Sequence, residues 1–148
     1  MSKTFRQGYY HLQHPEKYLG NPNNVVYRSS WELRMHRFLD NNTQILRWSS
    51  EELKIPYVSP IDGRVHHYFP DYYVEYINRH GEVIQEIIEV KPAAQTTAPK
   101  SSRGKSRKTL LYEQQTYAVN QAKWKYAMDW CEKRGLKFRV MTENSLFR

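Results

Sequence analysis

The sequence predicts a single α/β domain of 148 residues, and three patterns along the chain support this fold class. The segment 110–134 repeats apolar residues at steps of three and four, which is typical of a long amphipathic helix. Segments between positions 44 and 91 are rich in β-branched and aromatic residues and are separated by turn-forming residues. An alternating segment, 136–141, predicts a last strand. These patterns together predict helices packed on a sheet.

The N-terminal third predicts an arm followed by a helix. The first 24 residues lack sustained periodicity and contain two glycines and two prolines, so we expect an extended arm, 1–24, rather than a second domain. Ser29 is the predicted N-cap of the first helix, because Glu32 three residues later completes a capping box. The helix is expected to run to about Asp40. Its predicted apolar positions are Trp31, Leu33, Met35, Phe38 and Leu39.

The middle of the chain predicts a meander of about four strands, joined by turns at 60–63 and 78–81. The long helix that follows is expected to bury Tyr117, Gln121, Trp124, Met128 and Cys131, and to end at Gly135. The candidate strands before it are 44–49, 53–58, 64–69 and 82–91, and 71–77 continues the sheet from 64–69.

The segment 93–108 differs in composition from its surroundings. Thr, Ala, Ser, Pro and Gly dominate it, and five Lys and Arg residues are interspersed. It predicts a flexible basic loop directly after the last strand of the meander. A solvated linker would have the same composition, but the position of this basic loop favours a segment that holds a polyanionic partner and becomes ordered on binding.

The bulk composition narrows the class of protein. With 39% hydrophobic residues the chain can bury one core, and a net charge of +8 favours a polyanionic partner. Cys131 is the only cysteine, which excludes an intrachain disulfide and fits a reducing compartment. No apolar run is long enough to cross a membrane, and no signal-peptide pattern is found at the N-terminus.

The stretch 86–92 reads Glu-Ile-Ile-Glu-Val-Lys-Pro and predicts a buried strand that ends at its proline. Because side chains alternate along a strand, Glu89 and Lys91 are expected on one face and Val90 on the other. Such charges on an apolar strand are costly unless they are paired, hydrated or bound to a metal. Asp71, eighteen positions before Glu89, can add a second carboxylate there. Two acidic oxygens and a lysine commonly hold Mg²⁺ against a phosphodiester.

This pattern resembles the PD-(D/E)xK nuclease superfamily, because Pro70-Asp71 and Glu89-Val90-Lys91 match both half-motifs at a spacing that a β-hairpin spans. The short pattern alone is weak, and the flanking sequence strengthens it. The resemblance implies a restriction-endonuclease-like core, in which a mixed central β-sheet is flanked by helices. It also implies a deoxyribonuclease that uses Mg²⁺, with Mn²⁺ as a substitute.

The flanking sequence resembles proteins of tailed phages over nearly the whole chain except 93–108. The resemblance implies a nuclease of phage head completion and head–tail joining, acting on packaged double-stranded DNA with portal or head-neck proteins as partners. Its expected location is the host cytoplasm during assembly, with the virion as a second location. The flanks are 28–32, 62–64 and 68–73 for small PD-(D/E)xK proteins, and 3–8 and 27–52 for head completion nucleases of T-even-type phages.

The same resemblance assigns roles to the charged residues. Asp71 and Glu89 would be metal ligands, and the carbonyl of Val90 would complete the site. Lys91 would stabilise phosphoryl charge or position water; a role as base is less favoured, since neighbouring carboxylates favour its charged form. The alternative is structural: Asp71 caps a strand end, and Glu89 pairs with Lys91 at the surface.

Two further positions are left open by the sequence. Glu32 is explained by its capping box, yet related nucleases carry an acid on the first helix that faces the metal, so Glu32 is either a cap or a third acid. On the long helix, Gln114, Gln115, Tyr117, Gln121 and Lys125 occupy the zone of a polar site residue, and Gln121 is preferred.

Contacts to DNA are expected to be with the backbone rather than the bases, because no base-reading motif is present. One rival interpretation is a structural head-completion protein that binds DNA without cutting it. Another is a transposase or repair-type endonuclease subunit with the same core. The predicted DNA-binding residues are Arg28, Lys100, Arg103, Lys105, Arg107, Lys108 and Lys125.

Overall fold

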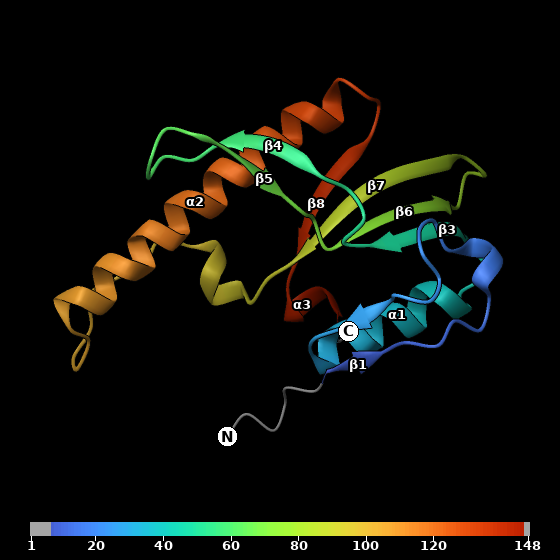
Figure 1. Cartoon of the computed structure of the whole chain (residues 1–148), viewed down its shortest axis with the longest axis horizontal. Coiled ribbons are helices and arrows are strands. Elements are labelled where there is room, and N and C mark those ends of the chain that lie inside the picture. The colour runs from blue at the N-terminus through green and yellow to red at the C-terminus, as the bar shows by residue number, and fades with distance from the viewer. Residues whose placement is uncertain (1–6, 147–148) are drawn as a thin grey trace.

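The computed structural model describes residues 7–146, and its centre is a four-stranded sheet covered on both faces (Figure 1). The first helix, α1 (Ser30–Asn41), packs on one face and the long helix, α2 (Arg107–Glu132), on the other. β7 and β8 are parallel and the other pairs antiparallel, so the sheet is mixed. This confirms the predicted α/β fold class. The sheet order is β3 (Ile45–Ser50), β6 (Tyr72–Ile77), β7 (Val83–Val90) and β8 (Lys137–Met141).

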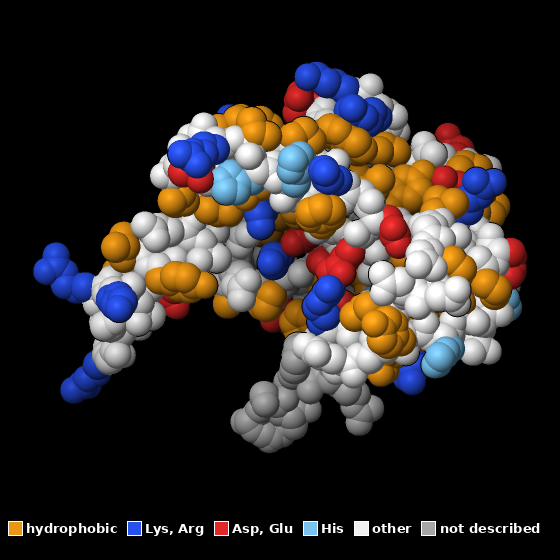
Figure 2. Space-filling view, viewed as in Figure 1, with side chains coloured by type: hydrophobic (Ala, Val, Ile, Leu, Met, Phe, Trp, Pro, Cys, Tyr) orange, Lys and Arg blue, Asp and Glu red, His pale blue; other side chains and the backbone are white. Residues whose placement is uncertain are grey.

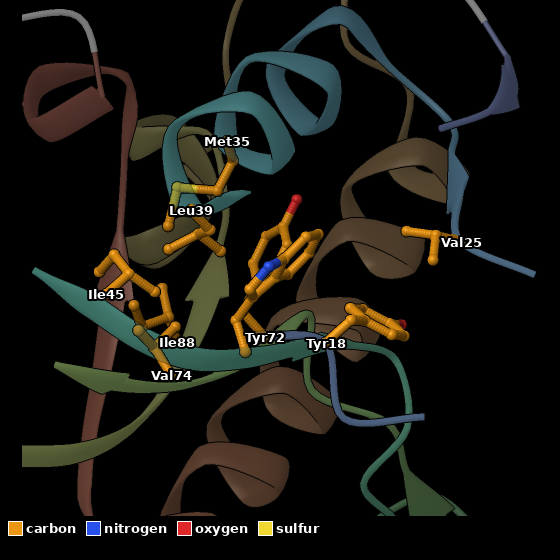
Figure 3. Close-up of a cluster of buried hydrophobic side chains, with 9 residues drawn as sticks. Tyr18, Val25, Met35, Leu39, Ile45, Tyr72, Val74 and Ile88 are labelled. Carbon is orange, nitrogen blue, oxygen red and sulfur yellow. The ribbon is translucent and has the colours of Figure 1, made fainter. Parts of the chain in front are cut away.

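Helix α1 begins where the capping box predicted. The Glu32 N–H donates to Ser29 Oγ at 3.2 Å, and Glu32 Oε1 accepts the backbone N–H of Arg28 at 3.1 Å. The buried side chains include Met35 and Leu39, as expected, but Phe38 is 54% exposed. Figure 3 shows this cluster, in which Met35 and Leu39 of α1 lie above residues of the sheet.

Two polar side chains are buried under α1, and both are satisfied. His36 Nε2 donates to the carbonyl of Val26 at 3.0 Å, so Nδ1 accepts the hydroxyl proton of Tyr72 at 2.8 Å. Burial lowers the pKa of His36, which keeps the ring neutral. Asp40 accepts hydrogen bonds from the hydroxyl of Tyr10 and from two backbone N–H groups of the arm.

The arm is therefore fixed against the body where it is described. β1 (Gly8–Tyr9) pairs with β2 (Val26–Tyr27), and a 3₁₀ turn occupies Pro15–Lys17. Tyr18 is buried against the core, whereas Tyr9 is 65% exposed. Residues 1–6 of the expected arm, including most of the 3–8 segment, lie outside the described residues.

The expected continuous meander is wrong in one respect. β3 pairs with β6, and its Ser50 lies opposite Tyr72, so the chain between them leaves the central sheet. That excursion forms a separate hairpin of β4 (Ile55–Val58) and β5 (Val65–Tyr68), which packs against α2. This arrangement results from pairing between strands that are distant in sequence, which the local residue pattern does not predict.

The segment 93–108 is shorter as a loop than predicted. Ala93–Thr96 forms a 3₁₀ helix, and Ser106 caps α2 by accepting the Thr109 N–H at 3.0 Å. Arg107 and Lys108 therefore lie in the first turn of α2 and not in the loop. No helix in the described part of the chain has the length and apolar character that a membrane crossing requires.

The buried face of α2 is rotated from the predicted one. Its buried residues are Asn120, Trp124, Ala127 and Cys131, whereas Gln121 is exposed and Met128 is 56% exposed. The predicted stripe shares only Trp124 and Cys131 with the observed one. The helix ends as expected before Gly135, whose φ of +72° allows the Leu136 N–H to reach the Cys131 carbonyl at 2.9 Å. A short helix, α3 (Glu143–Leu146), follows β8 and was not predicted.

Candidate active site

The β6–β7 hairpin brings two carboxylates face to face. Its register pairs Tyr72 with Ile88, so the next residues outward, Asp71 and Glu89, lie opposite each other. Val90 N–H donates to Asp71 Oδ2 at 2.8 Å, and Asp71 N–H donates a long hydrogen bond, 3.4 Å, to Glu89 Oε1. The spacing of eighteen residues is thus explained by a hairpin with its turn at 78–82.

Glu89 is 6% exposed and lies on the α2 face of β7, next to the buried Ile87. Tyr68 donates its hydroxyl proton to Glu89 Oε1 at 2.7 Å, and the Lys91 ammonium lies 3.7 Å from Oε2. Burial raises the pKa of Glu89, and these partners oppose the rise without cancelling it. The charged form of Glu89 is therefore incompletely compensated.

The charged form of Asp71 is also disfavoured by its surroundings. Burial raises its pKa well above the usual value, the charge of Glu89 raises it further, and the Val90 N–H only partly opposes this. A buried and a partly buried carboxylate that repel each other, with Lys91 beside them, form an arrangement that gains stability when a cation binds.

A hard divalent cation fits this pair by the chemistry of its donors, which are all oxygen. Within residues 7–146, no three His, Cys, Asp or Glu side chains are grouped so as to hold a metal ion. The site therefore offers two carboxylates, with the Val90 carbonyl as the candidate main-chain ligand. Mg²⁺ commonly binds through one or two carboxylates and keeps several waters, so this donor set suits it.

Glu32 shares its two oxygens between the roles left open by the sequence. Oε1 serves the helix cap, and no hydrogen bond to Oε2 is found in the described residues. The charge of Glu32 raises the pKa of Asp71, so the carboxylate lies within electrostatic reach of the pair. The cap leaves Oε2 available, but no three acids in the described part of the chain are grouped so as to bind one metal ion, so the structure does not place the expected metal ligand Glu32 beside Asp71 and Glu89.

Glu51 is an acid that the sequence did not single out. Its φ is +58°, which makes it the one non-glycine residue in the described chain with left-handed backbone. Its N–H donates to the carbonyl of Asp71 at 3.1 Å, and its carboxylate forms an ion pair with Arg28. Nothing in the local Ser-Ser-Glu-Glu sequence predicts this conformation. Arg28, which was expected to bind DNA, is thus paired with an acid whose backbone contacts Asp71.

On α2, the structure directs Lys123 rather than Gln121 towards the acids. Lys123 Nζ lies 5.7 Å from the ring centroid of Tyr68, and its pKa responds to the charges of Glu89 and Asp71. Gln121 and Lys125 are exposed, as are Gln114 and Gln115. The helix phase explains why Gln121 was preferred in the prediction. Position 123 lies one turn from Asn120, which is buried although it is polar and therefore was not part of the predicted buried face.

Most of the predicted DNA-binding residues lie in the loop before α2 and in the first turn of this helix, which project from the rest of the molecule (Figure 1). Figure 2 shows a hollow between this projecting part and the rest of the chain, with acidic side chains at its centre and Lys and Arg side chains at its border. Lys105 instead ties the segment together, pairing with Glu113 at 2.8 Å and donating to the Lys100 carbonyl at 2.7 Å. The exposed residues among the predicted DNA-binding positions are Arg28, Lys100, Arg103, Arg107, Lys108 and Lys125.

Comparisons with known proteins identify the family of this chain. The family described as TnsA-like endonuclease N terminal matches residues 42–143, a span that holds Asp71, Glu89, Lys91 and Lys123 but begins after Glu32. The head completion nuclease of Enterobacteria phage T4 is 37% identical over 133 residues, covering 88% of this chain and 86% of that protein. These matches confirm the resemblance found in the sequence. The chain belongs to the TnsA-like endonuclease family.

Proposed function

We propose that this protein is a Mg²⁺-dependent deoxyribonuclease that hydrolyses double-stranded DNA and leaves a 5′-phosphate. The observation that carries the proposal is the pair of Asp71, which is partly buried, and Glu89, which is buried, held opposite each other with Lys91 at 3.7 Å from Glu89. When bound, Mg²⁺ would polarise the phosphodiester and favour ionisation of the attacking water. Membership of an endonuclease family supports the same chemistry.

The chain's own residues supply the rest of the mechanism. Asp71 and Glu89 hold negative charge at a fixed position, and the hydrogen bond from Tyr68 fixes Glu89 in place. Lys91, on the same face of β7 as Glu89, places positive charge where the phosphoryl group gains negative charge. Glu32 is the candidate third acid, acting through the oxygen that the helix cap leaves available.

Contact with the DNA backbone would come from the basic residues around the hollow. The net charge of +8 favours counterion release on binding. Arg107 and Lys108 occupy the first turn of α2, where the helix dipole disfavours positive charge, and a phosphate there would relieve this cost. Backbone contacts of this kind carry little sequence specificity.

The biological setting follows from the relative named head completion nuclease. We assign this chain to head completion and head–tail joining in a phage, where it trims or cuts packaged DNA in the infected host cell. Portal or head-neck proteins are the proposed partners. The rival, a head-completion protein that only binds DNA, predicts no need for two adjacent acids whose charge is incompletely compensated.

The test is cleavage of supercoiled and linear duplex DNA with Mg²⁺ or EDTA, using wild type, Asp71→Ala and Lys91→Ala. Asp129→Ala is the matched control, because this exposed acid on α2 pairs with Lys133 at 3.1 Å, away from the site. Circular dichroism shows beforehand that each variant is folded. We expect Mg²⁺-dependent cleavage that both site substitutions abolish and the control retains.

Two results would reject the proposal. Wild type that binds DNA but never cuts it, even with Mn²⁺, would favour the binding-only rival. Cleavage that survives Asp71→Ala would show that the active site lies elsewhere or that a contaminating nuclease is present.

A further inference from the structure

Lys123 occupies an unusual position for a lysine on α2. It lies three residues after the buried Asn120 and four before the buried Ala127, so its stem shares the inward face of the helix. The side chain is half-buried, while Gln121 and Lys125 on either side of it are exposed. The fold has therefore placed a cation on the side of α2 that packs against the sheet and the β4–β5 hairpin.

Two tyrosines of the hairpin form the surface on which Lys123 rests. Its Nζ lies 5.9 Å from the ring centroid of Tyr57 and 5.7 Å from that of Tyr68. These distances are at the outer limit of cation–π attraction, so the rings attract the ammonium only weakly and do not replace a counter-ion. Tyr68 interacts with two charged residues: Lys123 lies near its ring, and Glu89 accepts a hydrogen bond from its hydroxyl.

Lys123 differs from Lys91 in having no counter-ion. Lys91 pairs with Glu89 at 3.7 Å, whereas Lys123 makes no ion pair and no side-chain hydrogen bond within residues 7–146. Burial lowers the pKa of Lys123, the charge of Lys91 lowers it further, and Glu89 and Asp71 oppose this. Its ammonium thus lies within electrostatic reach of the whole acidic pair while its three donors remain available.

We propose that Lys123 contacts the substrate by donating to a non-bridging oxygen of the DNA phosphate held at the acidic pair. This inference rests on the proposed nuclease function and divides the work of the two lysines. Lys91 is held by Glu89, while Lys123, on a different element, binds the phosphate and stabilises its charge during hydrolysis. Phosphate oxygen is the natural acceptor for an ammonium that the protein leaves without one.

The competing explanation is that Lys123 only packs the hairpin on α2 through its aliphatic stem. Lys123→Met separates the two, because it keeps an unbranched apolar stem and removes the charge. Lys123→Arg restores the charge. Lys133→Met is the matched control, since it removes one charge from the exposed C-terminal end of the same helix.

The first measurement is duplex binding over a range of salt concentrations, followed by fluorescence anisotropy, with Ca²⁺ in place of Mg²⁺ so that a hard cation can hold the phosphate at the acids. We expect Lys123→Met to reduce the slope of log K against log salt by about 0.9, the value for one lost phosphate contact. Lys123→Arg should keep the wild-type slope, because its charge is retained. An unchanged slope for Lys123→Met overturns the proposal, and this arm gives its answer even if the protein never cuts DNA.

The second measurement is cleavage with Mg²⁺. We expect Lys123→Met to lower kcat about 10²-fold with a Tm close to that of wild type, and Lys123→Arg to recover most of the loss. Tyr68→Phe keeps the ring and removes the hydroxyl bonded to Glu89, so it should lower kcat without changing the salt slope. A lower Tm with kcat and slope both unchanged would assign Lys123 to packing; Lys123→Gln replaces the Met variant if that variant does not fold.

Discussion

Two glutamates of one strand, Glu86 and Glu89, are almost equally buried and differ in how their charge is compensated. Glu86, 4% exposed, faces α1 and accepts a hydrogen bond from Arg139 of β8 at 3.0 Å. Glu89, 6% exposed, faces α2, where its partners are a tyrosine hydroxyl, a long backbone hydrogen bond and a lysine at 3.7 Å. Burial raises the pKa of Glu89, which indicates an unmet need for positive charge at this position.

We infer from this difference that Glu86 is a structural carboxylate and that Glu89 belongs to the proposed active site. An arginine beside Glu86 can meet the charge within the fold, and the nearby 630 Å³ cavity under α1 is lined mostly by apolar side chains. Glu89 shares its position with a second acid, Asp71, which increases the cost of ionising either. Burial alone therefore does not mark a site, whereas burial with incomplete compensation does.

The largest test of this comparison exchanges each glutamate for its neutral isostere. Glu89→Gln should lower kcat/KM for duplex cleavage by about 10²–10³-fold, because it removes a charged oxygen from the site. Glu86→Gln should leave cleavage within about threefold of wild type and destabilise the fold by only about 1 kcal/mol, because the amide oxygen can still accept from the half-exposed Arg139 and only the charge of the pair is lost. Steady-state kinetics and urea unfolding measure the two effects. Equal losses of activity would remove the distinction between the faces.

The second test asks on which side of the comparison Glu32 belongs. Glu32→Gln keeps an oxygen for the Arg28 N–H, so the cap should survive, and cleavage should fall about 10–100-fold if the charge serves the site. Ser29→Ala should cost about 1 kcal/mol of stability and leave cleavage within twofold. Unchanged cleavage by Glu32→Gln would make this residue structural, like Glu86.

The smallest expected effect is on thermal stability without metal. Folding raises the pKa of Asp71, so protonation of this carboxyl stabilises the folded state. This contribution to the free energy of unfolding is complete below the pKa of the unfolded chain, about 4, and is lost as pH rises through the pKa of the folded chain. Asp71→Asn should therefore raise Tm in EDTA, increasingly from pH 4 to pH 8, by roughly 2–4 °C for each kcal/mol gained.

Mg²⁺ provides the control for that measurement. It should raise the Tm of wild type by mass action and have little effect on Asp71→Asn. A lower Tm for Asp71→Asn at pH 8 in EDTA would show that the fold already compensates the pair. The contrast with Glu86 would then fail.

The sequence predicted the acidic pair because local rules determine it. Alternation places Glu89 on one face of β7, and a hairpin of fixed length places Asp71 opposite. The capping of α1 by Ser29 was predictable for the same reason, since both partners lie within four residues. The structure realises these features within about one residue of the expected bounds.

What the sequence missed depends on contacts between distant segments. The apolar residues of α2 fit two helix phases that share Trp124 and Cys131, and packing against the β4–β5 hairpin selects the phase that turns Lys123 inward. That hairpin stands apart because β3 pairs with β6. Glu51 escaped notice because its left-handed backbone arises where these pairings meet.

The hairpin register also determines where this gene can tolerate changes in length. The turn at 78–82 is remote from the acids, and residues added there lengthen a surface loop without altering the pairing of Tyr72 with Ile88. A single residue inserted between Glu86 and Glu89 would instead turn one of the two carboxylates to the opposite face. Insertions and deletions should therefore accumulate at the turn among related genes and be absent from the few codons between the two glutamates.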